Sequence, residues 1–137
     1  MNIYLDIDGT LLHEELTSRH GKPAVGLAEF LLALRAHEPY WLTSHCRDGD
    51  PTVAQARLKP QVPETLHADI DQIQGTTWSL MKTEAIDWTC REFIWLDDHI
   101  AEAERARFAR VLPGQTFIEM NLRANPEQLI EIIADVL

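Results

Sequence analysis

The chain has 137 residues and a formal charge of −10, from 12 lysine and arginine residues against 22 aspartate and glutamate residues. This length suits one domain with a sizeable core, which we expect to span residues 1–137. The acidic excess disfavours a general binder of nucleic acid or anionic membranes, although a local basic groove is compatible with it. The sequence shows neither a run of membrane-spanning length nor a signal-like segment, so we expect a cytoplasmic protein without a membrane partner. Cys46 and Cys90 lack metal-ligand spacing and are expected to be reduced thiols.

The first informative stretch is an apolar run from Ile3 that predicts a buried strand and ends in two acids, Asp6 and Asp8. Gly9 follows at once and permits a sharp turn. Burying carboxylates is costly unless they are paired or hold a metal, and open α/β sheets place ligands at the carboxyl ends of strands. A simple Asp-Gly turn would explain Asp8 alone, but an aspartate inside an apolar run is less ordinary. We therefore predict a functional site at Asp6 and Asp8.

Polar residues 13–22 then predict a surface excursion, a flap beside the site. Residues 24–37 carry apolar side chains at helical spacing, and residues 40–44 after Pro39 predict a second strand. The order strand, helix, strand implies a parallel pair with a right-handed crossover. Thr43, near the end of the second strand, is a candidate site hydroxyl, although such residues are also common at strand ends.

Residues 45–75 give weaker signals. Asp50-Pro51 predicts the start of a helix that ends before Pro60, and a second short helix is expected from Pro63 to near Gly75. A short strand in this region or at 76–80 is an open alternative.

Lys82 precedes a short helix that we expect at 83–88, with Thr83 as its cap. Lysine is unfavourable at the start of a helix, so its position is better explained if an anion lies opposite. A solvated surface lysine is the simpler alternative.

The apolar run 93–96 is followed by Asp97 and Asp98, the same pattern of an apolar strand that ends in acids as at Asp6 and Asp8. Adjacent carboxylates repel one another unless a cation or a proton intervenes. Alternatively, one of the pair caps the helix expected at 100–111. A last strand at 116–120 and a terminal helix from residue 125 complete the chain. These elements predict an α/β fold, a Rossmann-like three-layer sandwich with a mostly parallel sheet of four or five strands.

The run Asp6-Ile7-Asp8-Gly9-Thr10-Leu11 resembles the first signature of the haloacid-dehalogenase-like (HAD) phosphohydrolases, and later signatures match in order at Thr43, Lys82 and Asp97-Asp98. The resemblance implies a HAD-like, Mg²⁺-dependent phosphohydrolase that acts on a phosphorylated substrate. It implies that Asp6 is the nucleophile and forms an aspartyl-phosphate, while Asp8 is the general acid and base. Thr43 would donate to the phosphoryl group and Lys82 would neutralise charge. Mg²⁺ would be held by Asp6, the Asp8 carbonyl and Asp97 or Asp98.

The segments between these signatures are too short for a cap domain, so an open site is expected, suited to a large substrate or covered in an oligomer. Trp78, Lys82 and Trp95-Leu96-Asp97-Asp98 resemble, more loosely, small HAD domains associated with bacterial RNA-repair proteins. A nucleic-acid-end phosphatase is therefore one alternative, although the net charge counts against it. Such a phosphatase would bind nucleic acid through a basic rim formed by Arg19, Lys22, His45, Arg47 and His99. The second alternative is a catalytically idle HAD-like binding module.

Overall fold

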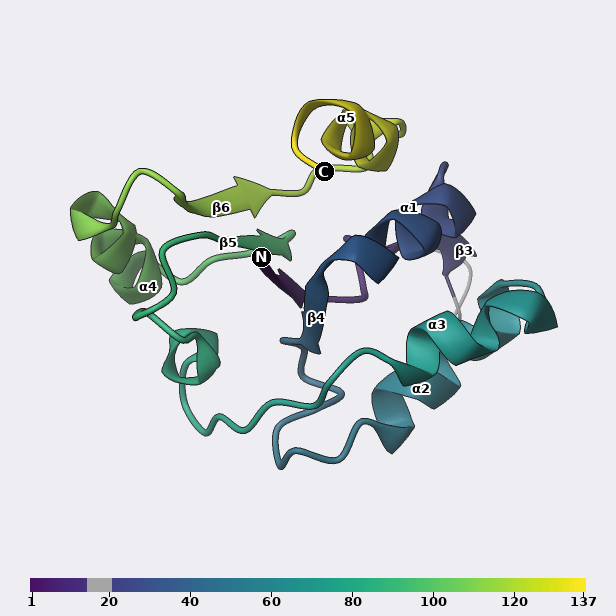
Figure 1. Ribbon diagram of the computed structural model, residues 1–137, viewed down its shortest axis with the longest axis horizontal. Helices are drawn as coiled ribbons and strands as arrows, with labels where there is room; N and C mark the ends of the chain where they lie inside the picture. The colour runs from purple at the N-terminus through teal and green to yellow at the C-terminus, as the bar shows by residue number, and fades with distance from the viewer. Residues whose placement is uncertain (15–20) are drawn as a thin grey trace.

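The computed structural model describes residues 1–14 and 21–137. Its centre is a four-stranded parallel sheet in the order β4-β1-β5-β6 (Figure 1). The strands are β1 (Asn2–Leu5), β4 (Glu38–Trp41), β5 (Phe93–Asp97) and β6 (Gln115–Glu119). The chain passes from β1 to β4 on one side and later returns to β5 on the other, so the strand order reverses at β1. The carboxyl edge of a sheet at such a reversal is where open α/β folds bind ligands.

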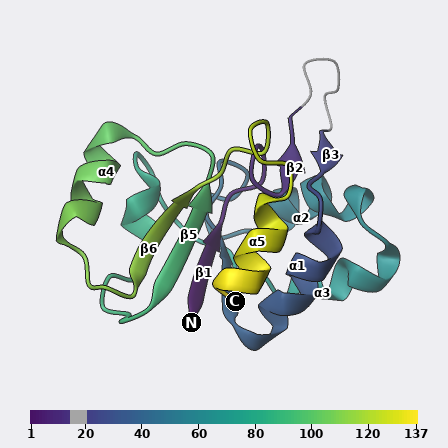
Figure 2. The same cartoon turned by 90° about the horizontal axis from the view of Figure 1, so that it is seen from above.

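Helices cover both faces of this sheet. Figure 2 shows α4 on one side and α1 and α5 on the other. The helices are α1 (Leu27–Ala33), α2 (Thr52–Leu58), α3 (His67–Asp71), α4 (Glu102–Arg107) and α5 (Gln128–Asp135). Short 3₁₀ turns lie at Leu34–Ala36, Lys59–Gln61, Glu64–Leu66, Lys82–Ala85 and Phe108–Arg110. The architecture is α/β with a parallel sheet, as predicted, and it is compatible with a Rossmann-like sandwich.

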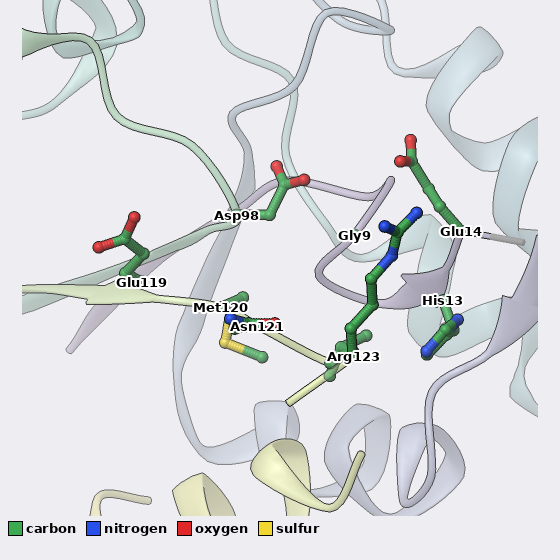
Figure 3. A pocket seen from close by; sticks show the side chains of 9 residues that line it. Gly9, His13, Glu14, Asp98, Glu119, Met120, Asn121 and Arg123 are labelled. Carbon is green, nitrogen blue, oxygen red and sulfur yellow. The ribbon is translucent and has the colours of Figure 1, made fainter. Parts of the chain in front are cut away.

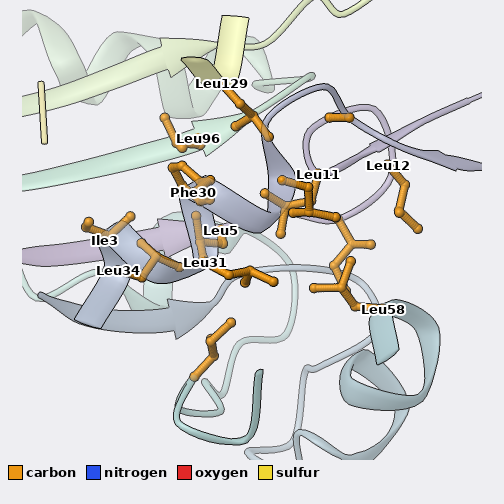
Figure 4. Close-up of a cluster of buried hydrophobic side chains, with 14 of the residues drawn as sticks. Ile3, Leu5, Leu11, Leu12, Phe30, Leu31, Leu34, Leu58, Leu96 and Leu129 are labelled. Atoms are coloured by element: carbon orange, nitrogen blue, oxygen red, sulfur yellow. The ribbon is translucent and has the colours of Figure 1, made fainter. Parts of the chain in front are cut away.

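Alternate residues of the central strands enter two different cores. On one face, Ile3, Leu5 and Leu96 pack with side chains of α1, α2 and α5, such as Phe30 and Leu58 (Figure 4). The opposite core contains the remaining strand residues and the aromatic side chains packed on them: Tyr4, Phe93, Trp95, Trp88, Phe108 and Phe117. Helices α2 and α3 contribute Leu58 and Ile70 to the first core, so part of the segment between β4 and β5 belongs to this core.

Several boundaries differ from the sequence prediction. Strand β4 begins at Glu38 and ends at Trp41, so Pro39 lies inside it. Proline is tolerated because β4 forms an edge of the sheet, where its missing N–H costs no ladder bond. The strand considered within 45–80 is represented only by isolated bridges, such as Tyr40 with Gln74.

The predicted caps also differ. The helix expected at 83–88 is the 3₁₀ turn Lys82–Ala85, and its cap is Met81 rather than Thr83. The Thr83 N–H instead donates to the buried carboxylate of Glu104 at 2.8 Å. Helix α4 starts after Ala101, without a side-chain cap, so neither Asp97 nor Asp98 caps it.

The predicted flap begins as a small hairpin in which β2 (Leu12–His13) pairs antiparallel with β3 (Lys22–Pro23). The rest of the predicted flap, residues 15–20 including Arg19, lies outside the described residues. Within the described ranges, none of the helices has the length and hydropathy needed to cross a membrane.

Candidate functional site

Three carboxylates converge at the carboxyl edge of the sheet. Asp6 directly follows β1, Asp97 ends β5, and Asp98 comes next. The two strands are neighbours, and the Asp6 N–H donates to the Leu96 carbonyl at 3.0 Å. As a result, Asp6, Asp97 and Asp98 each offer a carboxylate oxygen, and these oxygens all lie within 4.8 Å of one another.

Lys82 reaches into this cluster from the 3₁₀ turn. Its Nζ donates to Asp6 Oδ1 at 3.2 Å and to Asp97 Oδ2 at 2.6 Å. The buried Asp97 carboxylate also accepts hydrogen bonds from Trp95 Nε1 at 3.2 Å and from the His99 N–H at 3.1 Å. Asp97 therefore anchors the lysine, whereas Asp98 is the solvent-exposed member of the cluster.

The electrostatics of the cluster reflect a shortage of positive charge. Burial, followed by the negative charge of Asp97, raises the pKa of Asp6 to about 6. Burial likewise raises the pKa values of Asp97 and Asp98, and repulsion from Asp6 adds to the effect on Asp98. Burial opposes the charge of Lys82, but the carboxylates of Asp6 and Asp97 outweigh it and raise the pKa of this lysine. One ammonium group leaves the three acids partly uncompensated, so a further cation would be bound favourably.

Gly9 allows Asp98 to lie close to the turn after β1. Its φ is +79°, a conformation that residues with side chains rarely adopt. A β-carbon at this position would also overlap the Asp98 carboxylate. Glycine is thus required here by backbone geometry and by the approach of a site residue.

The Asp8 side chain has different partners from the other acids. Arg57, on α2, donates to Asp8 Oδ1 from Nη2 at 2.6 Å and from Nε at 3.1 Å. His45 Nε2 lies 2.6 Å from Asp8 Oδ2. Burial disfavours the charged form of Asp8, but the hydrogen bonds from His45 and Arg57 outweigh it and lower the pKa.

From the sequence, Arg57 was expected only to lie in the helix between Asp50 and Pro60, and His45 only in a basic rim. A usable signal was present in the helix, because Arg57 lies between the buried positions Ala54 and Leu58 of α2. A charged side chain that close to a core-facing stripe needs a partner.

A cavity of about 420 Å³ lies over the cluster. The residues that line it are Asp6, Asp8, Glu14, Ser44, Trp78, Leu80, Lys82, Asp97, Asp98, His99 and Glu104. Thr43 is fully buried, and its Oγ1 accepts a hydrogen bond from the His45 N–H at 3.4 Å. The adjacent Ser44 is the hydroxyl residue in the lining, while the donor role of Thr43 stays a prediction.

A second cavity of about 580 Å³ adjoins the first, since Asp98 and Glu14 line both (Figure 3). Its other walls include His13 of the hairpin, Glu119 of β6, and Asn121 and Arg123 of the loop that follows. The site is thus an open depression that extends across the carboxyl edge of the sheet.

Comparison of the chain with protein-family models, with curated proteins and with solved structures found no match. Function is therefore inferred from the chemistry of these side chains, because a fold alone does not specify an activity.

Proposed function

We propose that this protein is a Mg²⁺-dependent phosphohydrolase with a HAD-like, Rossmann-like fold and no cap domain. It would hydrolyse phosphomonoesters through an aspartyl-phosphate on Asp6. The observation that supports this most is the convergence of Asp6, Asp97, Asp98 and Lys82 in one cavity at the strand-order reversal.

The donor set fits Mg²⁺. This ion prefers oxygen ligands and is commonly held by one or two carboxylates together with waters and a substrate phosphate. Asp6 and Asp98 would be its direct carboxylate ligands, because Asp97 already accepts hydrogen bonds on both oxygens. The Asp8 backbone carbonyl would add a further oxygen. When bound, the ion would neutralise the charge that develops on the phosphoryl group.

Asp6 would attack phosphorus, so that one difficult displacement is divided into two easier ones. Lys82 would keep Asp6 ionised and attract the phosphate, since phosphoryl transfer depends mainly on positioning and charge stabilisation. The hydroxyl of Thr43, as predicted, or of the neighbouring Ser44 would donate to the phosphoryl oxygens.

Asp8 would protonate the leaving oxygen and then take a proton from the attacking water. A bound phosphate dianion nearby would favour the protonated form needed in the first step. Once the leaving group has departed, the hydrogen bonds from Arg57 and His45 favour the charged form, which accepts a proton in the second step. Arg57 and His45 are thus positioning residues for Asp8.

The test is turnover of an aryl phosphate with Mg²⁺ by the wild-type protein and Asp6→Asn. We expect Asp6→Asn to lose activity by a factor on the order of a thousand, because it removes the nucleophile. Asp71→Asn, an exposed acid paired with Lys59, is the matched control and should retain activity. After acid quenching, mass spectrometry should find phosphate on the wild-type chain only. Equal turnover by wild type and Asp6→Asn would disprove the proposal.

The same turnover assay, extended to other phosphate esters, separates the two alternatives, a nucleic-acid-end phosphatase and a catalytically idle binding module. Turnover confined to phosphorylated oligonucleotides would identify a nucleic-acid-end phosphatase. Among the residues of the predicted basic rim, His45 contacts Asp8 and Arg47 stacks on Trp78, so both have partners inside the molecule. Failure to turn over any ester or to bind beryllofluoride would favour the idle module.

A further inference from the structure

The loop that leads into Lys82 forms an apolar edge of the catalytic cavity. Trp78 and Leu80 line this cavity together with Asp6 and Lys82. Leu80 is 88% exposed, whereas the next most exposed large apolar residue among those described, Val53, is 59% exposed. Among the described residues, the most exposed large apolar side chain therefore lines the proposed site.

Hydrogen bonds hold this loop firmly from one side. The Glu84 carboxylate accepts the backbone N–H groups of Ser79 at 3.3 Å, Leu80 at 2.9 Å and Met81 at 2.6 Å. It also accepts the Ser79 hydroxyl at 3.0 Å. A single side chain thus orders three consecutive residues, and the exposure of Leu80 is a consequence of a fixed backbone.

The other side of the loop is held by Arg47 and Trp78. The Arg47 guanidinium lies 4.4 Å from the centre of the Trp78 ring and donates to the Ser79 carbonyl. Trp78 Nε1 donates to the Cys46 carbonyl at 3.1 Å. The indole is therefore oriented before any ligand arrives, which lowers the entropic cost of binding.

We propose that Trp78 and Leu80 form an apolar lip that binds the leaving group of the substrate. The preferred substrates are small phosphomonoesters whose leaving group carries an aromatic ring. This inference rests on the proposed function, because it places the phosphate at Asp6 and Lys82, two residues beyond Leu80. Binding sites of this kind combine apolar walls with a few polar groups that orient the ligand.

Charge favours a small substrate over a nucleic acid. The chain carries a net charge of −10. The cavity lining also includes Glu14, which is neither one of the acids that contact Lys82 nor a proposed Mg²⁺ ligand. A polyanion would be repelled by this field, whereas a monoester needs only its one phosphate to be neutralised.

The test is calorimetric binding of phenylphosphonate and methylphosphonate to the Mg²⁺-loaded protein. Neither ligand has an ester bond, so the measurement does not depend on turnover. We expect the wild-type protein to bind phenylphosphonate about tenfold more tightly, from burial of the ring against the lip. Leu80→Ser should lower this ratio about threefold, because Trp78 remains as the other wall of the lip, and leave the affinity for methylphosphonate unchanged. Leu112→Ser is the matched control, because Leu112 is 52% exposed and lines a different cavity, beside Trp88.

The outcomes separate this inference from the proposed function. Equal affinity of the wild type for both ligands, or a ratio that Leu80→Ser does not change, overturns the lip while the phosphate site stands. Binding of neither ligand, with no turnover of aryl phosphates, disproves the proposed function and this inference with it. A phosphorylated oligonucleotide that binds more tightly than phenylphosphonate, and equally well to Leu80→Ser, would overturn the substrate class in favour of nucleic-acid ends.

Discussion

Replacing Lys82 by methionine removes the ammonium group between Asp6 and Asp97 and keeps most of the apolar stem. The side chains are poorly exposed, at 18% for Lys82, 9% for Asp6 and 1% for Asp97. Removing one partner from a buried ion pair costs about 3–5 kcal/mol, because it leaves the other charge uncompensated. The charge and hydrogen bond of Lys82 lower the pKa of Asp6, so their loss raises this pKa and Asp6 relieves part of the cost by taking up a proton. We therefore expect the lower end of the range, a loss of about 3 kcal/mol in the free energy of unfolding.

Lys59 offers a control with the same chemistry in a different environment. Its Nζ lies 2.6 Å from Asp71 Oδ1, the same distance as in the Lys82–Asp97 pair. The side chains of Lys59 and Asp71 are 30% and 47% exposed, and an exposed pair contributes about 0–1 kcal/mol. Lys59→Met should therefore lower the free energy of unfolding by less than about 1 kcal/mol.

The assay is urea unfolding in the presence of a chelator, monitored by tryptophan fluorescence. The slope of the unfolding free energy against urea concentration should be the same for all variants, which confirms a common unfolded state. Equal losses for Lys82→Met and Lys59→Met would refute the reasoning from burial. Adding Mg²⁺ should restore part of the loss in Lys82→Met, since the cation supplies an alternative countercharge, and should not restore any in Lys59→Met.

Two further predictions concern Asp8 and Asp6. Arg57→Ala should lower kcat on the order of tenfold, because Asp8 loses the hydrogen bonds that position it. The control is Arg35→Ala, which breaks a surface pair with Asp69 and should leave kcat unchanged. Equal kcat values for the two variants would contradict the role given to Arg57. In the metal-free protein, the pKa of Asp6 is about 6 when folded, against an ordinary value of 3.8. The folded state then binds more protons than the unfolded state between these values, so stability falls as pH rises through this window. Asp6 contributes about 3 kcal/mol to this fall. In unfolding curves from pH 4 to pH 7, Asp6→Asn should remove that contribution and leave the contributions of Asp97 and Asp98, whose pKa values are also raised. A pH profile that Asp6→Asn does not change would contradict the prediction.

The strand tips were predictable because a buried parallel strand is a nearly continuous apolar run. In β1 and β5 the run is followed at once by an acid, which marks the end of the strand as well as a candidate ligand. Parallel pairing of the two strands then brings Asp6 and Asp97 to the same edge of the sheet. Local sequence and a simple topological rule were sufficient for this part of the site.

The partners of Asp8 were not predictable in the same way. Arg57 is 49 residues away from Asp8 in the chain, and its contact depends on how α2 packs into the first core. Likewise, β4 ends at Trp41, earlier than expected, and the turn that follows buries Thr43 and leaves Ser44 in the cavity lining. Such details depend on tertiary packing, for which the local pattern carries little information.

The hydrogen bond from the Asp6 N–H to the Leu96 carbonyl places the acidic tips of β1 and β5 next to each other as soon as the sheet forms. Mutual repulsion at this edge is therefore built into the native state and absent from the extended chain. If Mg²⁺ binds as proposed, it stabilises only the native state, so the folded fraction rises with the free ion concentration. Magnesium depletion would then shorten the lifetime of the protein against proteases as well as stop its chemistry.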